Sequence, residues 1–251
     1  MITMATADSL LALLALLVTF TPGTPQSWLT GDALRYLPEP STRPSPDDDK
    51  SPLEVRIDVS LTNILGVYNN KEVEVLVWLS MHWSSRDLSV FNGFWNSVYE
   101  VTLPSKHLWL PDITVYNAVS RPEVLSPDVV NLRQYGSVRY VSSLRVRVPC
   151  DLQYLETESG ATCTLKLASW AHTNRTLTMT TSESSNSLTD YVPNTDYDIL
   201  STSTSRHTTT YPFCPGDSYE GILFNFSIRS TRQTVPLWEA EELNHNIELP
   251  F

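Results

Sequence analysis

Alternation of apolar and polar residues is the feature that most limits what this chain can fold into. Residues 53–61 carry Leu, Val, Ile, Val and Leu at odd positions and polar side chains between them, a period of two over nine residues. The same pattern recurs in residues 72–78, 138–148, 162–170 and 222–229. Several such segments separated by turn residues are typical of an all-β sandwich. The 251 residues are enough for one domain of this class.

The same alternation predicts which large side chains point away from the core. Trp78 shares its parity with Glu72, opposite to the valines of its segment. Arg139 and Val141 lie on the outward parity of their segment, and so does Trp170. A single outward tryptophan is often only a packed surface residue. Two of them on different strands, with tyrosines in nearby loops, indicate a binding site or an interface.

The chain outside these strands divides by composition. An apolar run of about eleven residues, 10–20, is too short for a membrane helix, which needs roughly 20. It precedes a Pro-Gly break, so residues 1–26 are predicted to be a signal peptide, although no Lys or Arg comes before the run. Other segments are a short helix at 27–37, an extended solvated linker at 38–52, a Thr-rich exposed strand at 201–210 and an acidic tail at 232–251. We therefore expect a domain at residues 27–231 that is secreted and extracellular, with no membrane span.

Charge and motif content exclude several functions. The net charge of −11 would repel a phosphate backbone, so nucleic acid is not an expected partner, whereas cations would be attracted. The five histidines lack the spacing of a zinc site, and no G-x-S-x-G elbow marks a hydrolase. We expect no enzyme activity, catalytic residue, metal or cofactor.

The three cysteines and two sequons fit an oxidising compartment. Cys150 and Cys163, with twelve residues between them, are the expected disulfide. A closed loop of that size stabilises a fold by roughly 3 kcal/mol. Cys214 is then a free or capped thiol, or a bridge between subunits. Asn174 and Asn225 are candidate glycosylation sites.

Several motifs together resemble the ligand-binding domains of Cys-loop receptors and their soluble homologues, the acetylcholine-binding proteins. They occur in the order expected over about residues 27–231: Trp78 and Trp83 in WLSMHW, WLPDITVYNA at 109–118, RPEVL at 121–125, the twelve-residue cysteine loop, Ser169-Trp170, YPFCP at 211–215 and YE at 219–220.

The resemblance implies a fold, an assembly and a site. The fold would be a ten-stranded immunoglobulin-like β-sandwich with a short N-terminal helix, assembled as a ring-shaped homopentamer. The ligand would lie between subunits, with a principal face of Tyr116, Trp170, Tyr211 and Tyr219 and a complementary face of Trp78, Arg139 and Val141 from the neighbour. Aromatic faces attract cations without a fixed anion, so the implied ligand is a cationic amine such as acetylcholine or a nicotine-like alkaloid.

Two residues depart from the family pattern. Phe213 stands where acetylcholine-binding proteins have the first of two adjacent cysteines, so Cys214 has no vicinal partner. Arg139 places a positive charge beside a cation site. It either points to solvent or recognises a carboxylate or carbonyl of the ligand, and Asp190 could offset its charge.

Two alternatives remain. The chain could be the extracellular domain of a pentameric channel subunit, or a structural pentamer with a vestigial pocket. In channel subunits the cysteine loop is apolar and carries Phe-Pro. Here it has no Pro and contains Asp151, Glu156 and Glu158, and such a loop would not bury against membrane helices.

Overall fold

The computed structural model describes residues 34, 37–45, 51–89, 99–182, 185, 187–193 and 195–231. The expected signal peptide and acidic tail lie outside these residues, and only Leu34 and Leu37 of the expected N-terminal helix are described. The chain divides into two compact units, residues 1–37 and 38–251, and the fold below is that of the second unit.

The alternating segments form strands. Their bounds are β1 Leu53–Tyr68, β2 Glu72–Ser84, β3 Glu100–Pro104, β4 Ile113–Val115, β5 Glu123–Val124, β6 Val129–Arg133, β7 Ser137–Pro149, β8 Ala161–Ser169, β9 Leu177–Thr180, β10 Tyr197–Thr210 and β11 Ser218–Ser230. The helical pieces are short: α3 Arg86–Ser89, η2 Ser105–His107 and η3 Gln134–Gly136. None of the described helices is long and apolar enough to cross a membrane.

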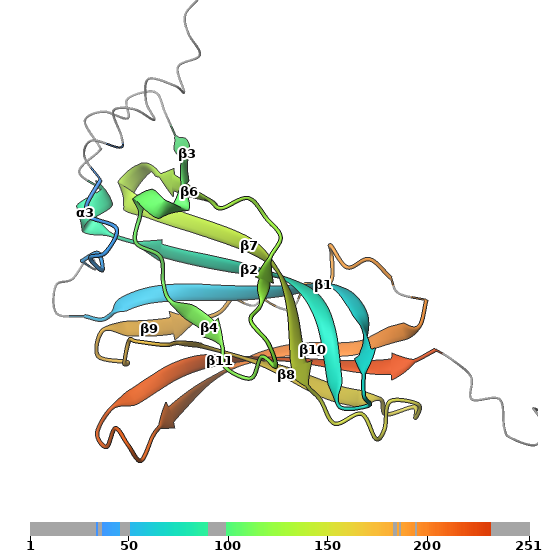
Figure 1. Ribbon diagram of the computed structural model, residues 1–251. Coiled ribbons are helices and arrows are strands. Elements are labelled where there is room, and N and C mark those ends of the chain that lie inside the picture. Colours follow the sequence, from blue (N-terminus) through green and yellow to red (C-terminus); the bar gives the residue numbers. More distant parts are fainter. Residues whose placement is uncertain are drawn as a thin grey trace, which may run out of the picture. The chain divides into compact units, whose positions relative to one another are not determined.

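The strands form two sheets (Figure 1). The larger has the order β3-β6-β7-β2-β1-β9, with β5 paired to β7, and the smaller has the order β10-β11-β8-β4. All pairs are antiparallel except β1 with β9. The predicted β-sandwich is confirmed. The described residues contain eleven strands rather than the ten that the resemblance implies.

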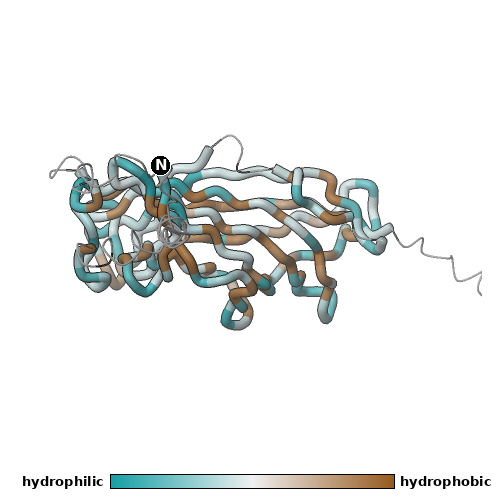
Figure 2. The backbone as a smooth tube through the Cα atoms, turned by 90° about the horizontal axis from the view of Figure 1, so that it is seen from above, coloured by the Kyte–Doolittle hydropathy of each residue, from teal (hydrophilic) through white to brown (hydrophobic). Residues whose placement is uncertain are grey.

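The core lies between the inner faces of the two sheets. The odd residues of β1 from Leu53 to Leu61 are at most 1% exposed, and Phe224 and Phe226 of β11 are fully buried. Hydrophobic and hydrophilic residues follow one another along the strands (Figure 2). The parity predicted from the sequence is therefore the parity of the structure.

Two local expectations need correction. The described part of the predicted linker is not wholly solvated, because Pro44 is buried and the backbone N–H of Ser45 donates to the Asp87 carboxylate over 2.8 Å. The alternation of residues 222–229 places Asn225 on the side opposite to Phe224 and Phe226 and so predicts that it is exposed, but the residue is half-buried. Its side chain accepts a hydrogen bond from Thr164 on the neighbouring strand β8, which draws it onto the sheet surface.

Candidate binding site

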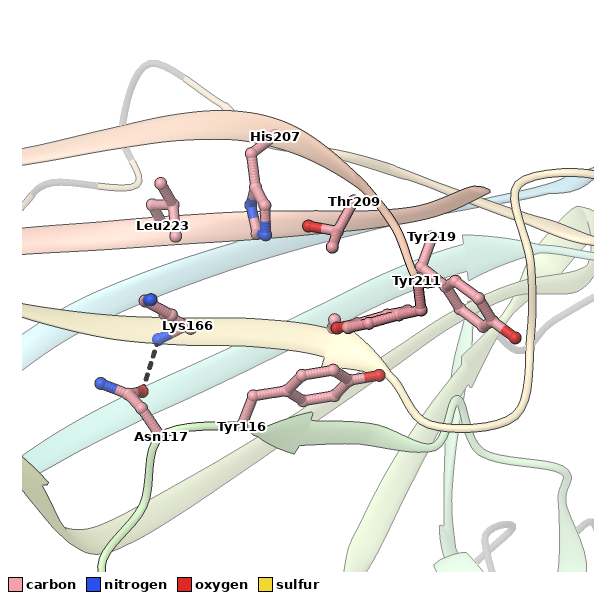
Figure 3. A pocket seen from close by; sticks show the side chains of 9 residues that line it. Tyr116, Asn117, Lys166, His207, Thr209, Tyr211, Tyr219 and Leu223 are labelled. Atoms are coloured by element: carbon pink, nitrogen blue, oxygen red, sulfur yellow. Dashed lines mark hydrogen bonds between the residues drawn. The ribbon is translucent and has the colours of Figure 1, made fainter. Parts of the chain in front are cut away.

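Five aromatic rings from four segments gather beside the smaller sheet. Tyr116 follows β4, Trp170 follows β8, Tyr211 and Phe213 follow β10, and Tyr219 lies in β11. Ring centroids are 5.7 Å apart for Tyr116 and Trp170, and 5.6 Å apart for Tyr211 and Tyr219. Figure 3 shows the three tyrosine rings next to one another. The structure thus brings the four predicted principal-face residues together.

These rings line an open hollow of about 410 Å³ (Tyr116, Trp170, Tyr211, Phe213 and Tyr219), which we call the aromatic cage. Trp170 is 70% exposed and Phe213 is 78% exposed. No lining residue is charged. The cage is accessible to a ligand and is not part of the hydrophobic core.

Phe213 was not predicted as a site residue. Its ring stacks on Tyr211 with centroids 5.2 Å apart and an interplanar angle of 21°. The sequence signal was its place at the hairpin tip, two residues after Tyr211. The family pattern marks position 213 as a cysteine position, and it does not predict an aromatic ring there.

Asp112 of the WLPD motif holds the turn that presents Trp170. One carboxylate oxygen accepts a hydrogen bond from the Ser169 hydroxyl over 2.5 Å, and the other accepts from the backbone N–H of Ala171 over 2.6 Å. The residues on both sides of Trp170 are therefore fixed by one side chain. The motif acts on the site through this anchoring.

Tyr116 is fixed from the same turn. Its hydroxyl donates to the carbonyl of Ser169 over 2.5 Å. Burial raises the pKa of Tyr116, with smaller contributions from Tyr211, Asp112 and Tyr219. A tyrosine phenol is neutral near physiological pH in any case, and the shift moves its ionisation further from that range.

The hairpin between β10 and β11 is held without a vicinal disulfide. Two successive turns form its tip, closed by the N–H of Cys214 to Tyr211 O and the N–H of Asp217 to Cys214 O. Arg175 donates to the carbonyl of Gly216 over 2.8 Å, and the N–H of Asn174 donates to Ser218 O over 2.8 Å. These contacts tie the hairpin to the loop that follows Trp170.

Cys214 is a free, half-buried thiol in this chain. It lies close to Tyr219, whose pKa is raised by burial first and by Cys214 next. The predicted Cys150–Cys163 disulfide is present.

The predicted complementary-face residues lie together on the outer face of the larger sheet. Val141 of β7 pairs with Ser80, beside Trp78 on β2, and Arg139 pairs with His82. Trp78 is 42% exposed and Val141 is 40% exposed. This face and the cage belong to different sheets, so the structure does not bring the two predicted faces together within one chain.

Arg139 has no carboxylate partner among the described residues, and its Nε is buried without an acceptor. The structure shows no ion pair between it and Asp190. The neighbouring His82 has a lowered pKa, caused first by burial and then by Arg56, Arg133 and Arg139. Arg56 pairs with Asp58 and Arg133 with Glu100, so Arg139 is the one of these three arginines that has no carboxylate partner in the described part of the chain.

Comparison with known proteins agrees with this geometry. Residues 33–233 match the family described as the neurotransmitter-gated ion-channel ligand binding domain. The structure superposes on AChBP from Bulinus truncatus with a TM-score of 0.71 and 33% identity, over 82% of this chain and 98% of that one.

Curated relatives are receptor subunits. The neuronal acetylcholine receptor subunit alpha-10 of Rattus norvegicus is 27% identical over 74% of this chain, and acetylcholine receptor subunit alpha-type acr-15 of Caenorhabditis elegans is 29% identical over 74%. The chain spans 42% and 39% of their lengths, less than half of each. The family match, the sandwich and the position of the cage agree, and the chain belongs to the neurotransmitter-gated ion-channel ligand binding domain family.

Proposed function

We propose that this protein binds cationic amines, such as acetylcholine or nicotine-like alkaloids, in the aromatic cage. The observation that carries the proposal is an open hollow lined entirely by aromatic residues, with no carboxylate to serve as a counter-ion. Aromatic faces supply negative potential without such an anion. The receptor relatives are named as acetylcholine receptor subunits, in agreement with this ligand class.

The energetics favour a site completed by a second subunit. A cation–π contact is worth about 0.5–1 kcal/mol when exposed and about 2 kcal/mol or more when desolvated. Micromolar affinity needs about 8 kcal/mol, and the exposure of Trp170 and Phe213 leaves these rings solvated in the isolated chain. We propose that the face bearing Trp78, Arg139 and Val141 of a neighbouring copy covers the cage in a homopentamer. Trp78 and Val141 are exposed apolar residues that such a contact would bury.

We also propose that the domain at residues 27–231 is a secreted binding protein and that residues 1–26 are its signal peptide. The disulfide fits an oxidising compartment. The carboxylate of Glu158 in the cysteine loop is 96% exposed and pairs with Arg229 over 2.7 Å. Burying this loop against a membrane domain would remove the Glu158 carboxylate and its ion pair from water, and this desolvation cost favours a stand-alone protein over a channel subunit.

Calorimetric titration with acetylcholine, nicotine and serotonin tests the proposal. We expect Trp170→Ala to weaken amine binding at least ~30-fold, the factor for a contact of about 2 kcal/mol. Tyr154→Ala is the matched control, because that ring is exposed in the cysteine loop. Micromolar affinity retained by Trp170→Ala would overturn the assignment. A wild-type pentamer that shows no heat and no change in tryptophan fluorescence with any amine would favour a structural role.

A further inference from the structure

A second hollow of about 410 Å³ lies next to the aromatic cage and shares Tyr116, Tyr211 and Tyr219 with it. Its remaining lining includes Lys166, His207 and Thr209 (Figure 3). Unlike the cage, it is also lined by an ammonium group, an imidazole and an aliphatic hydroxyl. We call it the polar hollow.

Strand register brings these donors to one surface. His207 on β10 pairs with Gly221 on β11, and Lys166 on β8 pairs with Leu223 two residues further along β11. Thr209 pairs with Tyr219 of the cage. Since alternate residues of a strand share a face, the polar hollow continues from the cage along the outer face of the smaller sheet.

Gly221 gives His207 its place. A Cβ at position 221 would lie 2.2 Å from His207 Cε1 and 2.9 Å from the carbonyl oxygen of Leu167. Because position 221 has no side chain, the imidazole can lie directly over β11 at this point. Any larger residue would displace the ring from the polar hollow.

The donors of the polar hollow are not paired with acids. Among the described residues Lys166 has no carboxylate partner, and His207 Nδ1 is buried without a hydrogen-bond partner. The Thr209 hydroxyl likewise has no partner in the described part of the chain. An ammonium group, an imidazole and a hydroxyl without acceptors make a site for an anionic or strongly accepting group.

The nearby acids are already engaged. Glu220 accepts from the N–H of Met179 over 2.9 Å and pairs with Arg206 over 3.3 Å. Asp112 is bonded to Ser169 and Ala171, as described above. No carboxylate lines the polar hollow.

We propose that the polar hollow binds the carboxylate of a ligand whose ammonium group occupies the aromatic cage, so that the preferred ligands are zwitterionic amines. The inference rests on the proposed function and specifies its ligand class. The cage attracts the cation, and Lys166 and His207 bind the acid. One small molecule would satisfy both because the two hollows share three rings.

The test compares trimethylammonium ligands that differ only in their second group. Glycine betaine and γ-butyrobetaine carry a carboxylate. Their methyl esters keep the trimethylammonium group and the chain length but lack the negative charge, and choline fills only the cage. Calorimetry should show at least one betaine binding about tenfold or more tighter than its ester. Lys166→Met should abolish this preference and leave choline affinity unchanged, whereas Lys166→Arg should keep most of it.

His207→Leu gives an independent measurement, with an expected loss of about threefold or more in the betaine preference and unchanged choline binding. Choline binding also reports that each variant is folded. If choline and the esters bind while neither betaine gains from its carboxylate, or if Lys166→Met keeps the gain, the polar hollow is not a carboxylate site. If choline, esters and betaines all fail to bind the wild-type pentamer, the aromatic cage proposal falls as well.

Discussion

Replacing Asp112 by Ala tests whether this carboxylate anchors the turn that presents Trp170, and it leaves every ring of the aromatic cage in the sequence. The substitution removes the acceptor of two short hydrogen bonds, from Ser169 Oγ at 2.5 Å and from the N–H of Ala171 at 2.6 Å. A hydrogen bond to a charged group contributes about 1.5–3 kcal/mol. Asp112 is half-buried, so water replaces part of each bond. We therefore expect a loss of about 2–4 kcal/mol in the free energy of unfolding.

Urea denaturation followed by tryptophan fluorescence measures this loss. With a slope of about 2 kcal/mol per molar, the midpoint should fall by about 1–2 M. The turn that presents Trp170 would also lose its fixed geometry. Because this turn would then have to be ordered when the ligand binds, the affinity for choline should fall about two- to tenfold. Asp151→Ala is the control, since that exposed carboxylate accepts only from Gln153 among the described residues. An Asp112→Ala midpoint equal to that of Asp151→Ala would refute the anchoring argument.

Three further predictions concern stability and titration. Replacing both bonded cysteines by Ala should cost roughly 3 kcal/mol for a sequence separation of 13, whereas Cys214→Ser should leave the urea midpoint almost unchanged; equal effects would contradict the loop-closure reasoning. His82 has a lowered pKa, so its contribution to stability is present above pH ~6.5 and is lost as the pH falls through its folded pKa. Arg139→Met should raise that pKa in an NMR titration, and an unchanged value would show that the charge of Arg139 does not contribute to it. Tyr116 has a raised pKa, so its contribution is present below pH ~10 and is lost as the pH rises through the folded value. In a pH titration followed by tyrosinate absorbance, Tyr116→Phe should lack one group that ionises at high pH, and an unaltered titration curve would contradict this.

The polar hollow and the aromatic cage are tested by different ligands. The cage requires only a cation, so choline reports on it alone. The polar hollow requires a carboxylate at a fixed distance from that cation, which is why betaines of two lengths are compared. The proposal for the polar hollow can thus fail while the proposal for the aromatic cage stands.

Much of the fold followed from local chemistry visible in the sequence. The period-two pattern of residues 53–61 predicts a strand and its buried side, because alternate side chains leave opposite faces of a pleated backbone. The same rule placed Trp78 and Trp170 off the core, and both are exposed. The cysteine pair was readable from spacing. These features depend on neighbours within one strand or one loop, so sequence order is sufficient to find them.

The tertiary structure decided what depends on pairing between strands. Register alone sets His207 over Gly221 and beside Lys166, residues separated by up to 55 positions in the chain. Phe213 became part of the cage only because the hairpin tip turns its ring onto Tyr211. Alternation tells which face a side chain occupies, but a shift of one residue in register would move every partner to the opposite face. The sequence therefore predicts most of the aromatic residues of the site, whereas the shape of the site and the polar hollow beside it depend on how the strands pair.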